Sequence, residues 1–219
     1  MNLRIRIWDL PTRLFHWLLT LAVLGSAITS QTGPIEWHAR FGYAALALLA
    51  FRLVWGFVGG IWSRFSSFIY SPASTWRYLR GGSPWAHKAG HSPLAALSVF
   101  ALLAVMTAQV GSGLFTDDEV LFMGPLASHA SGATVAWLTD YHKNIGKWLL
   151  LGLVILHIAA VLFYVLVRRD NLVAAMVSGD KLLPEPLPGS PDGPKQWALA
   201  LTVFSTCALL VAWLVLGAS

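Results

Sequence analysis

The sequence predicts an all-α integral membrane protein, and three observations lead to this fold class. Hydrophobic residues make up 56% of the 219-residue chain and charged residues only 11%, whereas soluble domains carry about 25% charged residues. The apolar residues are concentrated in five continuous runs, each long enough to cross a bilayer as a helix of about 20 residues. These runs do not alternate between apolar and polar residues as transmembrane β-strands do. Helices satisfy their own backbone hydrogen bonds in lipid, so we expect each run to be helical.

The five runs predict spanning helices at residues 12–31, 38–60, 93–115, 142–167 and 196–217. The first run has some features of a cleaved signal peptide, but His16 and Trp17 interrupt its apolar stretch, which favours a retained helix. Pro93 suits the first turn of the third helix. Between the second and third spans we expect a short surface helix around 72–80.

A Pro-rich segment, LLPEPLPGSPDGPKQ, occupies residues 182–196 and predicts a semi-extended linker. Such a linker sets the last helix apart from the others. We therefore expect three parts: a four-helix membrane domain at 1–181, the linker at 182–196, and a peripheral C-terminal transmembrane helix at 197–219.

The charges between the spans predict which connections face the cytoplasm. Cytoplasmic connections carry an excess of Lys and Arg, and the segments rich in these residues lie before the first span, between the second and third, and between the fourth and fifth. Their basic residues are Arg4, Arg6, Arg13, Arg64, Arg77, Arg80, Lys88, Arg168, Arg169, Lys181 and Lys195. The connection between the third and fourth spans is acidic instead. We therefore expect a cytoplasmic N-terminus and a C-terminus on the opposite side.

Four of the seven histidines lie within or at the ends of predicted spans: His16, His38, His142 and His157. Ionisable residues at membrane depth are rare and usually functional. The 15 residues from His142 to His157 correspond to about 22 Å along a helix and about 60° around it. One face of one helix thus offers two imidazoles at two depths. His38 lies near the outer level with His142, and His16 lies on the same side as His157, so the histidines form two pairs.

Two neutral imidazoles at one depth suit axial ligation of haem iron between the helices of a bundle. The single cysteine, Cys207, leaves no C-x-x-C-H attachment motif, so any haem would be bound non-covalently. No Glu-x-x-His pair occurs in a span, which disfavours a di-metal carboxylate site. The alternative is that each histidine is a polar residue bonded to a carbonyl of a neighbouring helix. The two depth-matched pairs favour two b-type haems.

Several motifs resemble one family, the bacterial cytochromes b561 and the related b-type cytochrome subunits of nickel–iron hydrogenases. The stretch WDLPTRLFHW, at 8–17, resembles the family opening W-D-x-P-x-R-x-x-H-W. HARFGYAALALLAFRLVWG, at 38–56, is similar to the second helix of the family, and GHSPLAALSV, at 90–99, to the start of the third. GLFTDDEVLFMGPLA, at 113–127, and HIAAVLFYVLVRRDNLVAAMVSGDK, at 157–181, resemble the branch often found beside c-type cytochromes. The resemblance covers about residues 7–181.

The resemblance implies that the four span histidines ligate two haems, with the fourth span supplying one ligand to each. Two features depart from the family pattern: the spacing from His142 to His157 is one residue longer than in many members, and the fifth helix exceeds the minimal four-helix form.

The implied function is that of a di-haem b-type cytochrome in the bacterial inner membrane. It would pass electrons between a ubiquinone or menaquinone pool and a periplasmic redox partner such as a c-type cytochrome. Alternatives within the family are a superoxide:quinone oxidoreductase and a hydrogenase cytochrome subunit. An alternative of another class is a haem-free membrane anchor for a soluble enzyme. A transporter is disfavoured because the spans show no pair of interrupted helices, and we expect membrane lipid but no nucleic acid as a partner.

Several basic residues are candidates for binding the haem propionates, because a guanidinium suits a carboxylate. Arg52 either pairs with a propionate of the inner haem or extends to the membrane interface. Arg13 has the same two interpretations, with a positive-inside anchor favoured. Arg40, Lys143 and Lys147 lie near the outer haem and bind either its propionates or lipid headgroups.

The remaining candidates lie in connections. His91, just before the third span, either binds a propionate, lines a quinone pocket or caps the helix. His87 and His129 are interpreted as solvated loop residues. The acidic run at 117–119 either attracts a basic face of a periplasmic cytochrome or is merely solvent-exposed.

Overall fold

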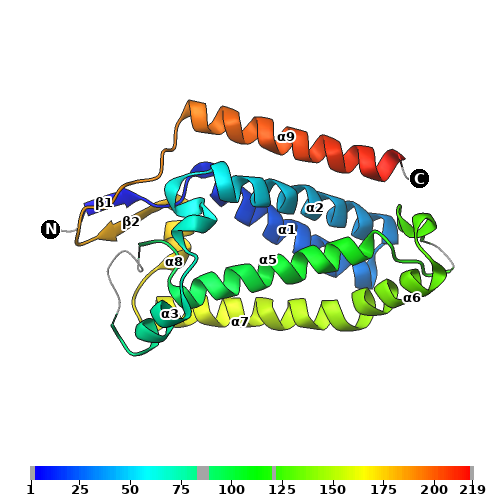
Figure 1. Cartoon of the computed structure of the whole chain (residues 1–219), viewed down its shortest axis with the longest axis horizontal. Coiled ribbons are helices and arrows are strands. Elements are labelled where there is room, and N and C mark those ends of the chain that lie inside the picture. Colours follow the sequence, from blue (N-terminus) through cyan, green and yellow to red (C-terminus); the bar gives the residue numbers. More distant parts are fainter. Residues whose placement is uncertain (1–2, 83–88, 120–121, 218–219) are drawn as a thin grey trace. The chain divides into compact units, whose positions relative to one another are not determined.

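The computed structural model of the chain describes residues 3–82, 89–119 and 122–217, and these residues are mostly helical. His87 and Lys88, named above, lie outside the described residues. In chain order the elements are β1 (Leu3–Arg6), α1 (Leu10–Thr32), α2 (Ile35–Val58), η1 (Ile61–Ser63), η2 (Phe65–Ser67), α3 (Pro72–Leu79), α5 (Pro93–Gly113), η3 (Ala127–His129), α6 (Gly132–Asp140), η4 (Tyr141–Gly146), α7 (Lys147–Leu166), α8 (Leu172–Ser178), β2 (Asp180–Leu183) and α9 (Pro194–Gly217) (Figure 1).

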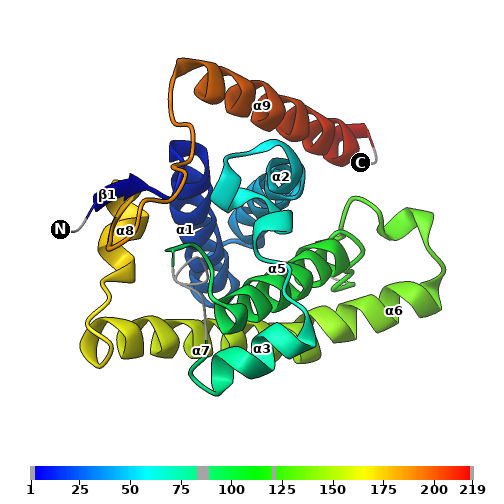
Figure 2. The ribbon, with the colours of Figure 1, turned by 60° about the vertical axis from the view of Figure 1, so that its left-hand side comes forward.

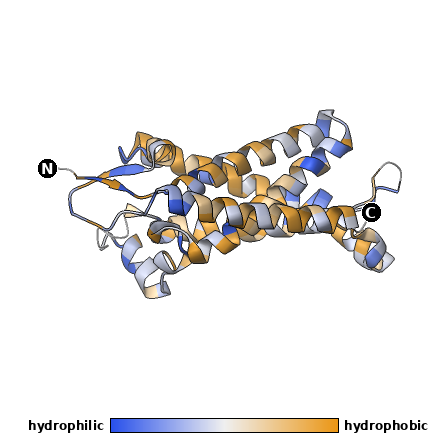
Figure 3. Ribbon diagram, turned by 90° about the horizontal axis from the view of Figure 1, so that it is seen from above, coloured by the Kyte–Doolittle hydropathy of each residue, from blue (hydrophilic) through white to orange (hydrophobic). Residues whose placement is uncertain are grey.

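Five helical segments within the described residues are long and apolar enough to cross a membrane: α1, α2, α5, the continuous run Gly132–Leu166, and α9. Apolar residues follow the length of these helices, and polar residues gather toward their ends (Figure 3). The prediction of a multi-pass helical membrane protein is confirmed. The predicted third helix does begin at Pro93, and α3 forms where the surface helix was expected.

The fourth spanning helix begins ten residues before the predicted start at residue 142. Helix α6 starts at Gly132 and continues through η4 into α7 without a loop (Figure 2). Ser131 caps its first turn by accepting a hydrogen bond from the backbone N–H of Thr134 at 3.2 Å. The hydropathy of the sequence predicted only the apolar part of this helix, because the charged residues Asp140 and Lys143 interrupt the run of apolar residues. His142 therefore lies inside a helix and not at its start.

Short polar side chains set several other helix starts, as expected for N-caps. Asp9 accepts the backbone N–H of Thr12 at 2.9 Å and opens α1, whose second residue is Pro11. Ser71 caps α3, whose first residue is Pro72. Proline at the first helical positions lacks only an N–H that has no partner within the helix, so these sequences favour helix starts where they occur.

A two-stranded antiparallel sheet, β1–β2, joins two distant parts of the chain and corrects the expectation of a purely helical fold (Figure 1). Leu3 pairs with Leu183 and Arg6 with Asp180. Asp180 also accepts hydrogen bonds from Arg4 at 2.7 Å and Arg6 at 2.5 Å. The strands have four residues each and lie far apart in the sequence, so no local sequence pattern predicted them.

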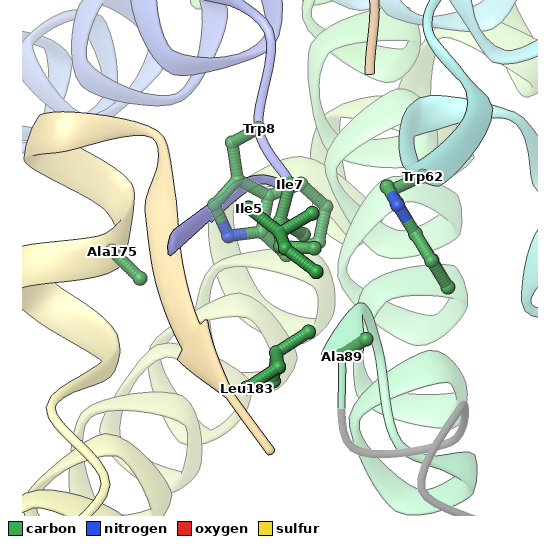
Figure 4. Packing of buried hydrophobic residues seen from close by; sticks show 7 residues of the cluster. All are labelled: Ile5, Ile7, Trp8, Trp62, Ala89, Ala175 and Leu183. Carbon is green, nitrogen blue, oxygen red and sulfur yellow. The ribbon is translucent and has the colours of Figure 1, made fainter. Parts of the chain in front are cut away.

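A small apolar core packs beside this sheet. These residues come from the N-terminal segment, η1, the segment just before α5, α8 and β2. The buried members are Ile5, Ile7, Trp8, Trp62, Ala89, Ala175 and Leu183 (Figure 4). Ile7 and Ala89 are fully buried. The core fixes the N-terminal WD motif against residues that come some 170 positions later.

The Pro-rich segment is held by hydrogen bonds to the N-terminal segment. The N–H of Ser190 donates to the carbonyl of Arg6 at 2.7 Å, and its hydroxyl donates to the carbonyl of Ile7 at 2.7 Å. Asp192 accepts the N–H of Leu10 at 3.1 Å, and Trp62 donates to the carbonyl of Pro188 at 2.9 Å. The segment that leads to α9 is thus an ordered strap.

The chain forms two compact units, and all five long helical segments contribute residues to both. Unit 1 comprises Met1–Leu14, Arg52–Ala101 and Ile155–Leu201, and unit 2 comprises Phe15–Phe51, Leu102–Val154 and Thr202–Ser219. Unit 1 contains the sheet and the apolar core. Unit 2 contains η4 and most of α1.

Candidate functional site

Two of the four predicted ligands, His38 and His142, lie close together in unit 2. His38 is on α2 and His142 is on η4, 104 positions later in the chain. Their ring centroids are 6.0 Å apart and their ring planes meet at 84°. The structure therefore brings together the pair that the sequence placed at the outer level.

Each of these rings is oriented by a carbonyl oxygen of a neighbouring helix. Nδ1 of His38 lies 2.9 Å from the carbonyl of Ser26 and 3.0 Å from its hydroxyl. Nδ1 of His142 lies 2.8 Å from the carbonyl of Gln109 and 3.2 Å from the hydroxyl of Ser112. A carbonyl oxygen can accept a hydrogen bond but cannot donate one. Each of these contacts therefore requires the ring N–H to be on Nδ1. With the ring proton on Nδ1, Nε2 of each neutral ring would be free to bind a metal.

The separation of the two rings is compatible with a metal held between them. A metal–imidazole bond is about 2 Å long. Adding the distance from the nitrogen to the ring centre on each side, two imidazoles on opposite sides of one metal would have ring centres about 6 Å apart. The observed 6.0 Å matches this separation. On α2, one turn after His38, a Cβ added at Gly42 would meet no atom within 4 Å. The surface of α2 is therefore open at this residue.

The basic residues predicted near this pair are exposed. The guanidinium of Arg40 lies 4.8 Å from the ring centre of Trp37, and the ammonium of Lys147 lies 5.0 Å from that of Trp148. Lys143, one residue after His142, lines an open pocket described below. Contacts between basic and aromatic residues at helix ends are typical of the membrane interface. A role for these residues toward propionates remains a prediction.

Arg52, on α2 in unit 1, is buried with only 3% of its surface exposed. Its guanidinium lies 4.7 Å from the ring centre of Phe65. The Nη1 atom is buried and has no hydrogen-bond partner among the described residues. A buried guanidinium N–H without an acceptor is costly, so Arg52 suits an anionic ligand better than an extended side chain at the interface.

His91 lies between two aromatic rings of unit 1, just before α5. Its ring centre is 4.7 Å from that of Trp8 and 4.4 Å from that of Phe68. Burial, helped by the nearby charges of Arg52, Lys181 and His157, lowers the pKa of His91 to about 3. The ring is therefore neutral, and its buried Nδ1 lacks a hydrogen-bond partner among the described residues. The helix start is capped by Ser92 instead, whose hydroxyl accepts the N–H of Ala95 at 3.4 Å.

Arg13 connects several segments of unit 1. Its Nη1 donates to the carbonyl of Val177 at 2.7 Å, and its Nη2 lies 3.5 Å from the carboxylate of Asp192. These contacts tie the start of α1 to α8 and to the strap. They give Arg13 a structural role within the protein.

The other two predicted ligands belong to different units. His16, in unit 2, has its ring centre 5.0 Å from that of Trp17. His157 is a partly buried residue of α7 in unit 1. The pairing of His16 with His157 remains a prediction. His129, expected in a loop, is exposed at the end of η3.

The residues that orient the histidines were not found from the sequence. Ser26, Gln109 and Ser112 contact the rings of His38 and His142. Gln109 is the one side-chain amide within the apolar third span. This was the sequence feature that could have indicated a role for the residue. No pattern in the sequence connects it to His142, which lies 33 positions later.

Comparisons with known proteins found one family model and several relatives that match most of the chain. Residues 7–179 match the family model described as prokaryotic cytochrome b561. A probable Ni/Fe-hydrogenase B-type cytochrome subunit of Rhizobium leguminosarum bv. viciae is 25% identical over 218 residues, covering 80% of this chain and 88% of that protein. Similar subunits are 26% identical in Cupriavidus necator, with 79% and 85% covered, and 23% identical in Escherichia coli K12, with 79% and 88% covered. No solved structure matches.

Proposed function

Because this chain belongs to the prokaryotic cytochrome b561 family, we propose that it is a di-haem cytochrome that carries electrons between membrane quinone and a periplasmic redox partner. Haem b and electron transfer at the membrane follow from the family. The number of haems, the four ligands, the quinone and the partner are the proposal. The outer haem would be held by His38 and His142, and the inner haem by His16 and His157. We place the protein in the inner membrane with its N-terminus in the cytoplasm.

The observation that supports the proposal most strongly is the pair His38 and His142. Two imidazoles from separate helices have ring centres 6.0 Å apart, and the Nδ1 of each lies within hydrogen-bond distance of a backbone carbonyl. His38 and His142 would hold a haem between them, and a haem with two imidazole ligands would supply single-electron transfer instead of oxygen binding. The chain's part is to hold the two Nε2 atoms in place and to exclude water with the apolar helices around them.

The inner haem would lie near buried polar groups of unit 1. Arg52 offers a buried N–H without an acceptor among the described residues, which suits a propionate carboxylate. His91 offers a second buried ring nitrogen in the same unit. Both residues would bind the anionic edge of the cofactor and leave His157 to its iron.

The periplasmic partner would dock beside the outer pair. An open pocket of about 440 Å³ adjoins η4 and is lined by Asp117, Glu119 and Asp140 together with Lys143 and Asn144. These carboxylates complement the basic face of a c-type cytochrome, and such complementarity speeds association more than it strengthens binding. Asn144 and Lys143 directly follow His142, so an electron would have a short way from the outer haem to this surface.

The test is electron transfer through the purified protein in lipid vesicles. A short-chain ubiquinol analogue should reduce the b-type absorbance within one turnover, and an oxidised soluble c-type cytochrome should then reoxidise it. His142→Ala should abolish reoxidation by the cytochrome while leaving reduction of the remaining haem. Absorbance that neither quinol nor cytochrome changes would contradict the proposal.

A second candidate, the cytochrome subunit of a Ni/Fe-hydrogenase, is favoured by the names of the relatives. It would use the same haems with a hydrogenase as the periplasmic partner. Anaerobic addition of H₂ to native membranes distinguishes the two. Reduction of the b haems that depends on this chain supports the hydrogenase role, and no reduction by H₂ supports a c-type partner.

A further inference from the structure

A π-helical segment, η4, interrupts the regular helix at His142. It covers Tyr141–Gly146 and joins α6 to α7. In a π-helix the hydrogen bonds run to the fifth residue and not the fourth, so the turn takes up one extra residue, and such turns are frequent at functional sites.

Gln109, on α5, holds both the ring and the main chain of His142. Its carbonyl accepts the Nδ1 proton of His142 at 2.8 Å, and its side-chain Nε2 donates to the carbonyl of His142 at 3.0 Å. A side chain inserted into a helical hydrogen-bond ladder is a recognised cause of local distortion. A helix that supplies no predicted ligand therefore fixes the ligand on another helix at two points.

The space around this contact is closed. Gly146 is buried, and a Cβ added there would collide with Oε1 of Gln109. A Cβ at Gly113 would lie 2.9 Å from Cε1 of His142. Oε1 of Gln109 is buried and has no hydrogen-bond partner among the described residues. An amide kept in place with one end unsatisfied costs stability, so its position calls for an explanation beyond packing.

We propose that Gln109 is a positioning residue that holds the π-helical turn at His142 and thereby sets the ring orientation of this axial ligand. The inference rests on the proposed function, since it needs His142 to bind the outer haem. The donor Nε2 stabilises the displaced carbonyl of His142, while the carbonyl of Gln109 fixes the rotation of the imidazole about its own axis. Gly146 and Gly113 leave the room that both contacts require.

Two substitutions disrupt, in different ways, the hydrogen bond from the side-chain amide of Gln109 to the carbonyl of His142. Gln109→Leu deletes the amide at nearly constant size, and Gly146→Ala pushes the amide away from His142 without altering it. Thr107→Ala, at an exposed position of the same helix, and Gly111→Ala, where a Cβ meets no atom within 4 Å, are the matched controls. Because two variants disrupt the contact, failure of one to fold leaves the other informative.

The readouts are the haem-to-protein ratio, the retention of each haem during dilution, and the electron paramagnetic resonance g-values of the oxidised haems. The g-values report the relative orientation of the two axial ring planes. We expect both variants to shift the g-values of one haem, the haem that His142→Ala removes, and to weaken its retention about tenfold, at the lower end of the effect of losing an outer-shell partner of a ligand. The second haem and both control variants should match the parent.

Unchanged g-values and retention of that haem in both variants would overturn the role of Gln109 while leaving the di-haem proposal intact. Equal changes at both haems would also overturn it, because they indicate general loosening of the fold. A parent protein that lacks the His142-dependent haem would contradict the proposed function itself, and with it the role of Gln109.

Discussion

At the scale of single residues, a glycine of α5, Gly113, lies beside the ring of His142. A Cβ at Gly113 would lie 2.9 Å from Cε1 of this ring, whereas a Cβ at Gly111 would meet nothing within 4 Å. Both glycines belong to α5. Of these two glycines, only Gly113 closely approaches the ring of His142.

We expect Gly113→Ala to displace the ring and reduce occupancy of one haem, with a loss of affinity of about tenfold or more. Gly111→Ala, the same chemical change on the same helix, should retain both haems. Haem quantitation on purified protein measures the difference. Equal haem content in the two variants would show that the space at Gly113 is not needed for the cofactor.

Arg52 offers a prediction for the inner site. Removing a buried positive charge beside a haem propionate favours the oxidised haem, so Arg52→Met should lower the midpoint potential of one haem, the haem lost in His157→Ala. Arg64→Met, at an exposed position that bonds the carbonyl of Gly59, is the control. A redox titration followed at the haem absorbance measures both. If neither potential moves, Arg52 does not pair with a propionate.

At the scale of elements, the start of α1 depends on one buried carboxylate. Asp9 is fully buried and accepts hydrogen bonds from the N–H of Thr12 at 2.9 Å, the N–H of Gly60 at 2.9 Å and the hydroxyl of Ser63 at 3.1 Å. One side chain therefore caps α1 and holds the loop after α2. This explains physically why the N-terminal motif contains an acid after its tryptophan.

Asp9→Ala should lower the free energy of unfolding by about 2 kcal/mol or more, because a helix cap is lost and buried donors lose their acceptor. Glu36→Ala, at an exposed position in the first turn of α2, is the control and should change stability little. Thermal unfolding in detergent compares them. A loss no greater than that of the control would contradict the capping role.

The sheet β1–β2 predicts a dependence on acid. Burial raises the pKa of Asp180, but hydrogen bonds from Arg6 and Arg4 outweigh it, so the pKa lies below its usual value. A carboxyl with a lowered pKa stabilises the fold fully above its ordinary pKa of about 3.9 and loses that contribution as the pH falls through the folded value. Stability should therefore fall on acidification below about pH 4.

Asp180→Asn removes the titrating group. The variant should be less stable than the parent at neutral pH, but its stability should fall less than that of the parent on acidification. Melting temperatures measured at pH 7 and about pH 3 test this, since only the difference between parent and variant isolates the carboxyl. An identical decrease in both proteins would contradict the ion-pair interpretation of the sheet.

The elements show which parts of the fold a sequence can reveal. Spans rest on local apolar runs, and helix starts on local residues such as Pro93 and Ser71, so both were predictable. The sheet β1–β2 depends on pairing between residues more than 170 positions apart. The early start of the fourth helix was hidden because polar residues near His142 end the apolar run although the backbone continues as helix.

For the molecule as a whole, the strap and α9 pose the question of the domain boundary. Asp192 and Ser190 bind the N-terminal segment, and Phe204 of α9 contacts Phe51 with ring centroids 6.1 Å apart. All four proposed ligands precede the strap. We propose that α9 is an addition to a haem-binding domain that does not need it for the cofactors.

A chain ending at Gly193 should therefore retain both haems. It should lose about 1 kcal/mol of stability for the aromatic contact with Phe51, besides other packing. A chain ending at Gly179 also lacks β2 and the strap and should be much less stable. Haem content and melting temperature of the two truncations measure this. Loss of a haem in the longer truncation would contradict the proposed boundary.

The candidate site was partly predictable at this scale. Histidines in apolar spans are conspicuous, and matching their depths identified His38 and His142 as a pair, which the structure places 6.0 Å apart. Part of the support comes from the backbone carbonyls of Ser26 and Gln109, which any residue possesses. Such contacts depend on how the helices pack, and the amino-acid sequence carries no direct mark of them.

The central claim is that four histidines hold two haems in two pairs, and a reduced-minus-oxidised spectrum with haem quantitation tests it most directly. The parent should contain two b-type haems per chain. His38→Ala and His142→Ala should each lose one and the same haem, and His16→Ala and His157→Ala should each lose the other. A folded parent with one haem or none, or single variants that divide the haems in any other pairing, would contradict the account.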